Sequence, residues 1–593
     1  VAKAYTAAVD TAAEVVAYSG TVAANSARTL LATVDAATVT ASFDVATTVA
    51  SVVTASNSTS NAGTTFVLTD TNNTATGGAD NFTGGTGDDT FLAQAAASLS
   101  NGDVVNGGAG SDTLTARYSV TADSTINTSI TNVETINIDL DDGTTGTAHT
   151  TTINTSGFTG LTGAVSKNAD STTGNEDTLV FSNMASTVEA GVVNGDAFSN
   201  TTFTYKTTTG LTDTATLNLN NAKANTITIA GIETLTVDAE SGTSVIDTLT
   251  TAQATSLNIT GSGKLTLSSV DAVTKTIDAS AATGNVTLVG IGAVVSTITG
   301  GSGDDSVNMG TNLTAADTID LGAGSDTIII NADAITMSTL AVSNVEVIQA
   351  EATAGSNLTV ATAGQTGLTT LNLVENNTTS INSTVSDLAA GVGVTLTSDA
   401  AAGVVTGIIT LGLADASGTA DVLDVTLKGT NGADAGADND IEDLAFTNIE
   451  TLNITSHYAG TVALASTDWN EILDISSDTT LTALNVSGSQ RVKLVVGSEA
   501  TSMATLDGSA ATGDNTYSTL AIGNVTMTGG TGDDTLIFGS TLNNNDVVDA
   551  GAHGPLAADG DTLTATVTGL TATTGVLSIA NVETLNLTNA GTA

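Results

Sequence analysis

From Thr64 onward, short segments of the chain alternate between apolar and polar residues. The segments are rich in Thr, Val, Ile and Leu, and Gly, Asn, Asp and Ser separate them. Alternation with a period of two is typical of a β-strand that is buried on one face, and the separating residues favour turns. This part of the chain is therefore predicted to consist of many short strands joined by turns.

A recurring triplet of an apolar residue, Asn and a second apolar residue marks several of these segments. In a strand the two apolar residues face one side and the Asn faces the other. Similar strands that recur along one chain favour a parallel β-solenoid, a mostly β fold in which each coil hydrogen-bonds to the next and aliphatic side chains stack in rows. We expect the Asn side chains to form a ladder on the outer surface. The seven triplets are centred on Asn137, Asn218, Asn258, Asn372, Asn453, Asn485 and Asn586.

The first 62 residues follow a different pattern. Alanine is frequent there, and Tyr5, Val9, Ala12 and Val16 are spaced by four, three and four residues, which places them on one face of a helix. The polar run 54–63 is typical of a linker. Residues 1–62 are therefore predicted to be a short Ala-rich helical segment followed by a linker.

Charge narrows the classes of partner. The 593 residues include 61 Asp and Glu but only 11 Lys and Arg, so the formal net charge is −50. Because 40% of the residues are apolar and only 12% are charged, the chain can still bury a core. The charge argues against nucleic acid as a partner, since there is no basic surface to replace counterions. So many carboxylates require screening or a bridging divalent cation, and Ca²⁺ is the expected one.

Two further features exclude classes of protein. The chain has no Cys, so disulfides, thiolate catalysis and Cys-ligated zinc are excluded. Its most apolar stretch, 286–298, is well below the roughly 20 residues that a helix needs to span a bilayer. No membrane span is therefore expected.

A larger unit occurs three times. Each copy begins with Gly-Gly-x-Gly-Asp-Asp, continues through a second Gly-rich turn, and closes with Asn-Val-Glu. The first glycines of the copies, Gly84, Gly300 and Gly529, are 216 and 229 residues apart, a spacing too regular for chance. The predicted organisation after residue 62 is a first module at 63–140, a solenoid or another β insertion at 141–299, a second module at 300–350, a β-rich solenoid at 351–528 and a third module at 529–593.

The Gly and Asp residues of these turns are candidate metal ligands. Gly permits positive φ, which lets the backbone point carbonyl oxygens inward, and the Asp that ends each turn adds a carboxylate. Such oxygens suit Ca²⁺, whose shell of six to eight ligands requires two turns on adjacent coils. The candidate ligands are Gly78, Asp80, Gly84, Gly85, Gly87, Asp88, Asp89, Gly107, Gly108, Gly110, Asp112, Gly300, Gly301, Gly303, Asp304, Asp305, Gly322, Gly324, Asp326, Gly529, Gly530, Gly532, Asp533 and Asp534.

Two details of these turns lead to further expectations. Gly78 and Asp80 lie nine residues before Gly87 and Asp89, which predicts that these two turns pair at the first ion. Acidic residues also recur in phase after Asn-Val or Asn-Ile, where they are either calcium ligands or solvated carboxylates at the start of a strand. These residues are Glu134, Glu346, Glu450 and Glu583.

The turns resemble the RTX (repeats-in-toxin) calcium β-roll, whose repeat is Gly-Gly-x-Gly-x-Asp followed by x-apolar-x. The match is close at 84–92, 107–114, 300–307 and 529–536. It departs from the pattern where Leu321 replaces the first Gly of a second turn, and where His553-Gly554-Pro555 interrupts the corresponding turn of the third copy. Calcium sites at these two turns are expected to be weaker, rebuilt or empty.

Sparse RTX turns in a long, Lys-poor chain with Asn-Val-Glu strands further resemble the RTX-type surface-layer proteins of Gram-negative bacteria, over about residues 64–593. The resemblance implies an extracellular structural protein that follows type I secretion and self-assembles into a calcium-dependent, two-dimensional lattice on the cell surface. It also implies anchoring to lipopolysaccharide or its O-antigen, for which residues 1–62 are the candidate segment.

Two other classes remain open. An RTX adhesin stalk would use the same coils as a monomeric spacer. An enzyme of the parallel β-helix type that acts on polysaccharides is less favoured, because cations such as Lys264, Lys428 and Arg491 are isolated in the sequence. The three histidines, His149, His457 and His553, have no metal-ligand partner at a suitable spacing. We therefore expect no catalytic residues and no cofactor other than Ca²⁺.

Overall fold

A computed structural model describes most of the strand-rich part of the chain. Residues 1–61, where the helical segment is predicted, and Gly78 lie outside the described residues. The described ranges are 62–69, 79–95, 98–120, 122–142, 147–168, 176–294, 296–353, 356–375, 382–398, 406–429, 437–458, 469–477, 479–520, 523–552, 560–567 and 577–589.

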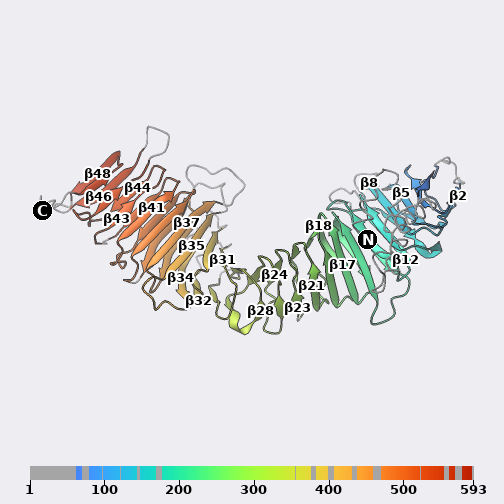
Figure 1. Cartoon of the computed structure of the whole chain (residues 1–593), viewed down its shortest axis with the longest axis horizontal. Coiled ribbons are helices and arrows are strands. Elements are labelled where there is room, and N and C mark those ends of the chain that lie inside the picture. Colours follow the sequence, from blue (N-terminus) through green and yellow to red (C-terminus); the bar gives the residue numbers. More distant parts are fainter. Residues whose placement is uncertain are drawn as a thin grey trace, which may run out of the picture. The chain divides into compact units, whose positions relative to one another are not determined.

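The chain is a parallel β-solenoid, as the alternating pattern predicts (Figure 1). Each strand pairs in parallel with the equivalent strand of the coil before it and of the coil after it. The only helices of the described residues are two short 3-10 helices, η1 (Thr155–Gly157) and η2 (Met337–Thr339). No helix in these ranges is long and apolar enough to cross a membrane. The chain divides into two compact units, Val1–Val294 (unit 1) and Val295–Ala593 (unit 2).

Three sheets form the walls of the coils in unit 1. The first is β1 (Ala62–Val67), β3 (Asp88–Ala93), β5 (Thr113–Val120), β8 (Thr135–Asp142), β11 (Gly163–Lys167), β13 (Glu189–Val193), β15 (Thr214–Asn220), β17 (Thr234–Ser241), β19 (Ser256–Gly261) and β21 (Thr276–Ala282). The second is β2 (Asn81–Thr83), β4 (Val104–Asn106), β7 (Ser129–Thr131) and β10 (Phe158–Thr159). The third is β6 (Ser124–Ile126), β9 (Thr150–Asn154), β12 (Thr178–Met184), β14 (Asn200–Tyr205), β16 (Lys223–Ala230), β18 (Thr243–Thr250), β20 (Lys264–Leu267) and β22 (Val286–Leu288).

Unit 2 repeats this arrangement. One set is β23 (Thr297–Thr299), β25 (Thr318–Asp320) and β28 (Ala341–Ser343). The second is β24 (Ser306–Gly310), β26 (Thr327–Asn331), β29 (Val347–Glu351), β31 (Thr370–Glu375), β33 (Gly393–Ser398), β35 (Val422–Gly429), β37 (Thr451–Tyr458), β39 (Ala483–Gly488), β41 (Thr505–Ala511), β43 (Thr526–Thr528), β45 (Val547–Asp549) and β47 (Ser578–Ala580). The third is β27 (Ala334–Thr336), β30 (Leu358–Ala361), β32 (Ser383–Leu388), β34 (Thr406–Leu413), β36 (Ala437–Phe446), β38 (Trp469–Ser477), β40 (Val492–Val496), β42 (Thr516–Thr519), β44 (Thr535–Phe538), β46 (Thr562–Val567) and β48 (Thr584–Asn589).

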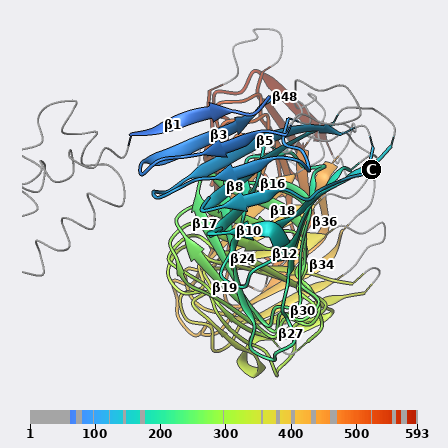
Figure 2. The same cartoon turned by 90° about the vertical axis from the view of Figure 1, so that its right-hand side faces the viewer.

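Rows of apolar side chains fill the interior of each unit. The strands β3, β5 and β8 lie side by side (Figure 2). Phe91 of β3, Leu114 of β5 and Ile136 of β8 occupy one register position on these successive coils, and all three are fully buried. Such rows arise because the strands alternate with period two and pair in register, so each inward side chain packs on its equivalent one coil away. Burial of a side chain of this size contributes about 1.5–3 kcal/mol.

The apolar-Asn-apolar triplets lie in these strands as predicted. Their apolar residues are buried, for example Leu452 and Ile454 of β37. The Asn side chains point outward and bond to the preceding coil: Asn485 Nδ2 donates to Asn453 Oδ1 (2.8 Å), and Asn453 Nδ2 donates to Asp424 Oδ1 (2.7 Å). The predicted outer ladder is therefore present, but the partners of the Asn residues are mixed. The triplet of β48 differs, with Leu585 50% exposed, because β48 pairs only with β46 among the described strands.

Candidate metal centres

The two Gly-rich turns of each module lie on adjacent coils and hydrogen-bond directly to each other. In the first copy the NH of Ala109 donates to the carbonyl of Gly85 (2.9 Å), and Ser111 NH donates to Asp88 Oδ1 (2.8 Å). The carbonyl bond recurs in the other copies, from Ala323 to Gly301 (3.0 Å) and from Ala552 to Gly530 (2.8 Å). The turns that were expected to adjoin therefore do so in all three modules.

Glycine is required at these turns for two different reasons. In the second turn Gly108 and Gly110 have φ values of 100° and 141°, which side-chain-bearing residues rarely adopt. In the first turn the requirement is steric, because a Cβ at Gly84 would overlap the carbonyl oxygen of Gly107 and the carboxylate of Asp89. Positive φ thus accounts for Gly108 and Gly110, and close packing of the coils accounts for Gly84 and Gly107.

Each module contains a row of carboxylates, one on each coil, that accept hydrogen bonds from the coil before. In the first copy Asp89 Oδ1 accepts from Thr64 NH (2.5 Å), Asp112 Oδ1 from Asp89 NH (2.6 Å), and Glu134 Oε2 from Asp112 NH (2.7 Å). Asp89 and Asp112 are 2% and 1% exposed. The carboxylates therefore join neighbouring coils at the point where each turn enters its strand.

The same Asp-Asp-Glu row is present in the other two modules. In the second copy Asp305 NH donates to Asp326 Oδ1 (2.7 Å), and Asp326 NH donates to Glu346 Oε2 (2.8 Å). In the third, Asp534 NH donates to Asp561 Oδ1 (2.7 Å), and Asp561 NH donates to Glu583 Oε2 (2.8 Å). The interruption at 553–555, which lies outside the described residues, therefore leaves the row of the third copy in place.

The in-phase Glu residues have a role that neither sequence interpretation included. Each accepts the backbone NH of an Asp one coil earlier, and it does so outside the RTX turns as well, where Asp421 NH donates to Glu450 Oε2 (2.8 Å) and Asp213 NH donates to Glu233 Oε2 (2.8 Å). The Asn two residues before the Glu adopts positive φ, 49° at Asn132, and turns the chain into the strand. Asp213 and Asp421 were missed because no Gly-Gly pair precedes them.

One carboxylate oxygen in the second turn is left without a hydrogen-bond donor. In the first turn of a module the second Gly donates to the Asp, as Gly85 NH does to Asp89 Oδ2 (2.6 Å). In the second turn the NH of the second Gly does not donate to the Asp: Gly108 NH donates to Asn106 Oδ1 (3.2 Å). Within the described chain Asp112 Oδ2 and Asp326 Oδ2 are therefore buried with no hydrogen-bond partner. A buried carboxylate oxygen in this state requires a cation or a proton.

The electrostatics of the rows point the same way. Burial raises the pKa of Asp112, and the neighbouring carboxylates Glu134 and Asp89 raise it further against the hydrogen bond from Asp89 NH. Burial raises the pKa of Asp326 to about 6, and it does the same for Asp534. A cation placed at these carboxylates would favour their charged form and so lower these pKa values again.

The donors present fit calcium in their chemistry. Asp112 Oδ2 and the carbonyl oxygen of Asn132 both border the space that a Cβ at Gly107 would fill. No group of three or more Asp, Glu, His or Cys side chains converges on one point in the described ranges, so main-chain carbonyls would have to complete a calcium shell. The residues that would hold the ion in the first module are therefore Asp112 and Asp89, with carbonyls of the stacked turns. In the second module Leu321 is buried in the core at the position of Gly107.

The predicted pairing of Asp80 with Asp89 is wrong. Asp80 belongs to a separate row on another sheet, in which Asp80 NH donates to Asp103 Oδ1 (2.9 Å) and Thr69 NH donates to Asp80 Oδ2 (2.7 Å). The strand after Asp80, β2, pairs with β4, whereas the strand that includes Asp89, β3, pairs with β5. A nine-residue step therefore moves the chain to a different wall of the same coil and not to the next coil.

Asp103 was missed in the sequence, together with its equivalents in the other modules. Asp317 Oδ1 accepts from Ser296 NH (2.7 Å), and Asp546 Oδ1 accepts from Val525 NH (2.8 Å). All three are buried and also accept from a backbone NH three residues earlier. The signal that would have found them is an Asp directly before a short Val/Thr-Val/Ile-Asn/Asp strand.

The fold and the rows define a class of protein, a parallel β-solenoid whose coils are joined by buried carboxylates at Gly-Asp turns. Comparison with known proteins does not extend this class to a family. No protein-family model matches the chain, and no curated protein sequence matches it.

Proposed function

We propose that this chain is an extracellular structural protein, a calcium-dependent surface-layer subunit that assembles with copies of itself into a two-dimensional lattice. The observation that supports it best is the pair of unpartnered, buried oxygens Asp112 Oδ2 and Asp326 Oδ2, each beside other carboxylates in an equivalent turn. Calcium at these turns would lock adjacent coils together and stabilise the solenoid. The proposal includes type I secretion and attachment to lipopolysaccharide through residues 1–62.

Lateral assembly follows from the charge of the chain. With 61 acidic and 11 basic side chains, two copies repel each other at low ionic strength. Divalent cations between neighbouring copies would remove this repulsion and bridge outward carboxylates, so one ion species would act both within the fold and between subunits. A monomeric adhesin stalk would need only the first of these two actions.

Electron microscopy of the purified chain in millimolar Ca²⁺, beside the same chain in excess chelator, tests the proposal. Ordered sheets with Ca²⁺ and dispersed particles in chelator are the expected result. Separate particles under both conditions would refute the lattice and favour the adhesin stalk. Mg²⁺ at the same concentration is the control for charge screening, because it dehydrates reluctantly and prefers strict octahedral geometry.

A variant pair connects the assembly to the turns. The double substitution Asp112→Asn and Asp326→Asn removes one charge from each of two candidate sites, and it should raise the Ca²⁺ concentration needed for sheets by tenfold or more. The control is Asp247→Asn with Asp415→Asn, which removes two exposed carboxylates outside the rows. An equal effect of both pairs would assign assembly to overall charge and not to these turns.

A further inference from the structure

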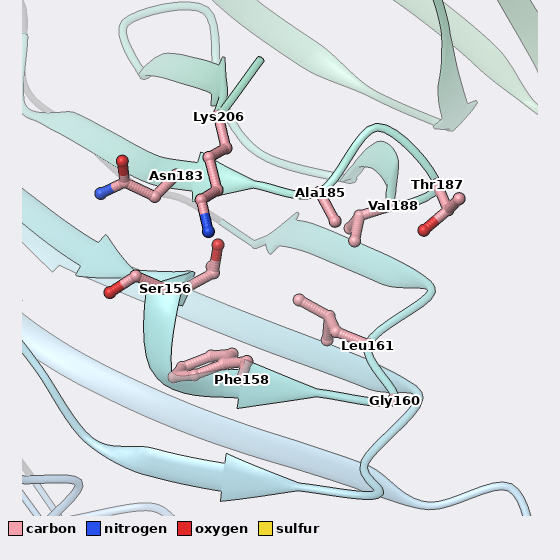
Figure 3. Close-up of a pocket in the computed structure, with 10 residues that line it drawn as sticks. Ser156, Phe158, Gly160, Leu161, Asn183, Ala185, Thr187, Val188 and Lys206 are labelled. Atoms are coloured by element: carbon pink, nitrogen blue, oxygen red, sulfur yellow. The ribbon is translucent and has the colours of Figure 1, made fainter.

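A pocket in unit 1 has a charge opposite to that of the chain. Its volume is about 200 Å³, and ten residues from the coils around β10, β12 and β14 line it (Figure 3). None of the ten is Asp or Glu, although the sequence has 61 of these, and one of the ten is Lys206. In a chain with only 11 Lys and Arg, a cavity with a cation and no acid favours a negatively charged ligand.

Hydrogen bonds within the protein hold the walls of the pocket. The helix η1 forms one side: Asn154 Oδ1 accepts from Ser156 NH (3.1 Å), and Thr155 Oγ1 donates to the carbonyl of Ser182 (2.9 Å). The opposite side is the turn after β12, in which Val188 NH donates to the carbonyl of Ala185 (3.0 Å). The pocket is therefore formed before a ligand arrives, which lowers the entropic cost of binding.

Lys206 is placed to meet the charge of the ligand. Its NH donates to the carbonyl of Met184 (2.8 Å), which fixes the backbone at the end of β14, and Figure 3 shows its ammonium group directed toward Ser156. Among the described residues no ion pair includes Lys206, whereas Lys493 pairs with Glu471 and Arg117 with Asp141. Its ammonium group is thus available to an anion at the pocket.

The remaining lining residues indicate what the anion is attached to. Phe158, Leu161 and Val188 give the pocket an apolar wall, and Ser156 supplies a hydroxyl group near the ammonium group (Figure 3). The amide of Asn183 points away from Lys206 and donates to Asn154 Oδ1 (2.9 Å). A pyranose ring matches this division, because it has an apolar C–H face and a rim of hydroxyl groups. The volume lies below the roughly 300–1,000 Å³ of sites for drug-sized ligands, which limits the pocket to one ring.

We propose that this pocket binds a single carboxylated sugar residue, a hexuronate unit, with its carboxylate at Lys206 and its ring against Phe158. This hexuronate unit belongs either to a soluble glycan or to a polysaccharide on a surface. In both cases the pocket recognises the same carboxylate and the same ring. This inference is independent of the proposed lattice, because a chain that forms sheets without binding a uronate would refute the pocket alone.

Ligand-observed NMR on the full chain tests the proposal with methyl glucuronide and methyl glucoside, which differ only in the C6 carboxylate. The glucuronide is expected to bind at least tenfold more tightly, with an advantage that shrinks as salt screens the half-open site. Equal affinity for the two sugars, or no glucuronide binding at 20-fold above a Kd on the order of 1 mM, would overturn the proposal.

Variants separate the pocket from general charge. Lys206→Gln should remove the tenfold preference, and Lys223→Gln, an exposed lysine on the neighbouring β16, should leave it unchanged. Phe158→Ala should weaken the binding of both sugars.

Other ligands test the chemical class. Inorganic phosphate that binds more tightly than the glucuronide would contradict a sugar as the ligand. Polyuronate and free oligouronate are then compared: binding of both through Lys206 supports the proposal, and binding that persists in Lys206→Gln refutes it.

Discussion

Asp112 Oδ1 accepts the backbone NH of Asp89 at 2.6 Å, while Asp112 Oδ2 lies buried with no hydrogen-bond donor among the described residues. One carboxylate thus has two separate roles. The first oxygen sets the distance between two coils, and the second requires a positive charge that the side chains nearby do not supply. A cation at this oxygen, as proposed, would couple ion binding to coil stacking through one residue of the first module, Asp112, and one of the second, Asp326.

The two roles are separable by substitution. Asp112→Asn keeps an acceptor for Asp89 NH, whereas Asp112→Ala leaves that buried NH unsatisfied at a cost of about 1–3 kcal/mol. In chelator we expect Asp112→Ala to lower the free energy of unfolding by that amount and Asp112→Asn to lower it by less. In Ca²⁺ both variants should lose the same additional stabilisation. Urea unfolding in the two buffers measures this, and an Asn variant as unstable as Ala in chelator would contradict it.

The pH dependence of stability without calcium follows from Asp326. Burial raises its pKa to about 6, above the value near 3.9 of an unfolded chain, so the folded state binds the proton more tightly. The contribution of this group to stability is therefore fully present below about pH 4 and is lost as the pH rises through about 6. In chelator the wild type should gain more stability than Asp326→Asn between pH 7 and pH 5, as measured by thermal unfolding.

Calcium should reverse this dependence, because the ion binds the charged carboxylate and competes with the proton. In saturating Ca²⁺ the wild type is expected to be less stable at pH 5 than at pH 7. The comparison with Asp326→Asn removes the general effect of relieving charge repulsion in so acidic a chain. Parallel pH profiles for the two proteins in chelator would show that Asp326 does not titrate in this range.

The architecture was predictable because it repeats locally. Alternation with period two placed Leu452 and Ile454 on the inner face and Asn453 on the outer face, and parallel stacking followed from the recurrence of such triplets. The Gly-Gly-x-Gly-Asp-Asp turns could be located for the same reason, since the backbone conformation and the close approach of coils require glycine at fixed positions within one turn.

Which residues pair between adjacent coils was not predictable, because this depends on the length of each coil. The bonded pairs Asp112–Glu134, Asp326–Glu346 and Asp421–Glu450 are separated by 22, 20 and 29 residues, because the loops between strands vary while the register of the strands does not. No fixed spacing in the sequence reveals such a pair. The error over Asp80 has the same origin, since the step from Asp89 to the next coil is 23 residues and not nine.

The Glu residues allow a test of coil stacking that distinguishes turns with and without a candidate ion. Glu346→Ala and Glu450→Ala each leave one Asp NH without its acceptor, so each should cost about 1–3 kcal/mol in chelator. Only Glu346 adjoins a Gly-rich turn, and we expect only its variant to change the apparent affinity for Ca²⁺. Calorimetric titration checks this, and Gln at either position should restore most of the lost stability.

Neighbouring glycines provide the sharpest test of the packing between coils. A Cβ at Gly84 would overlap the carbonyl of Gly107 and the carboxylate of Asp89, whereas a Cβ at Gly85 would meet no atom within 4 Å. Gly84→Ala should therefore destabilise unit 1 by about 1–3 kcal/mol, as overpacking does in a close-packed interior, while Gly85→Ala should be nearly neutral. Thermal and urea unfolding of both variants in chelator measure the difference. Because the two substitutions add the same methyl group to adjacent residues, equal stabilities would show that coils 84–89 and 107–112 are not in contact.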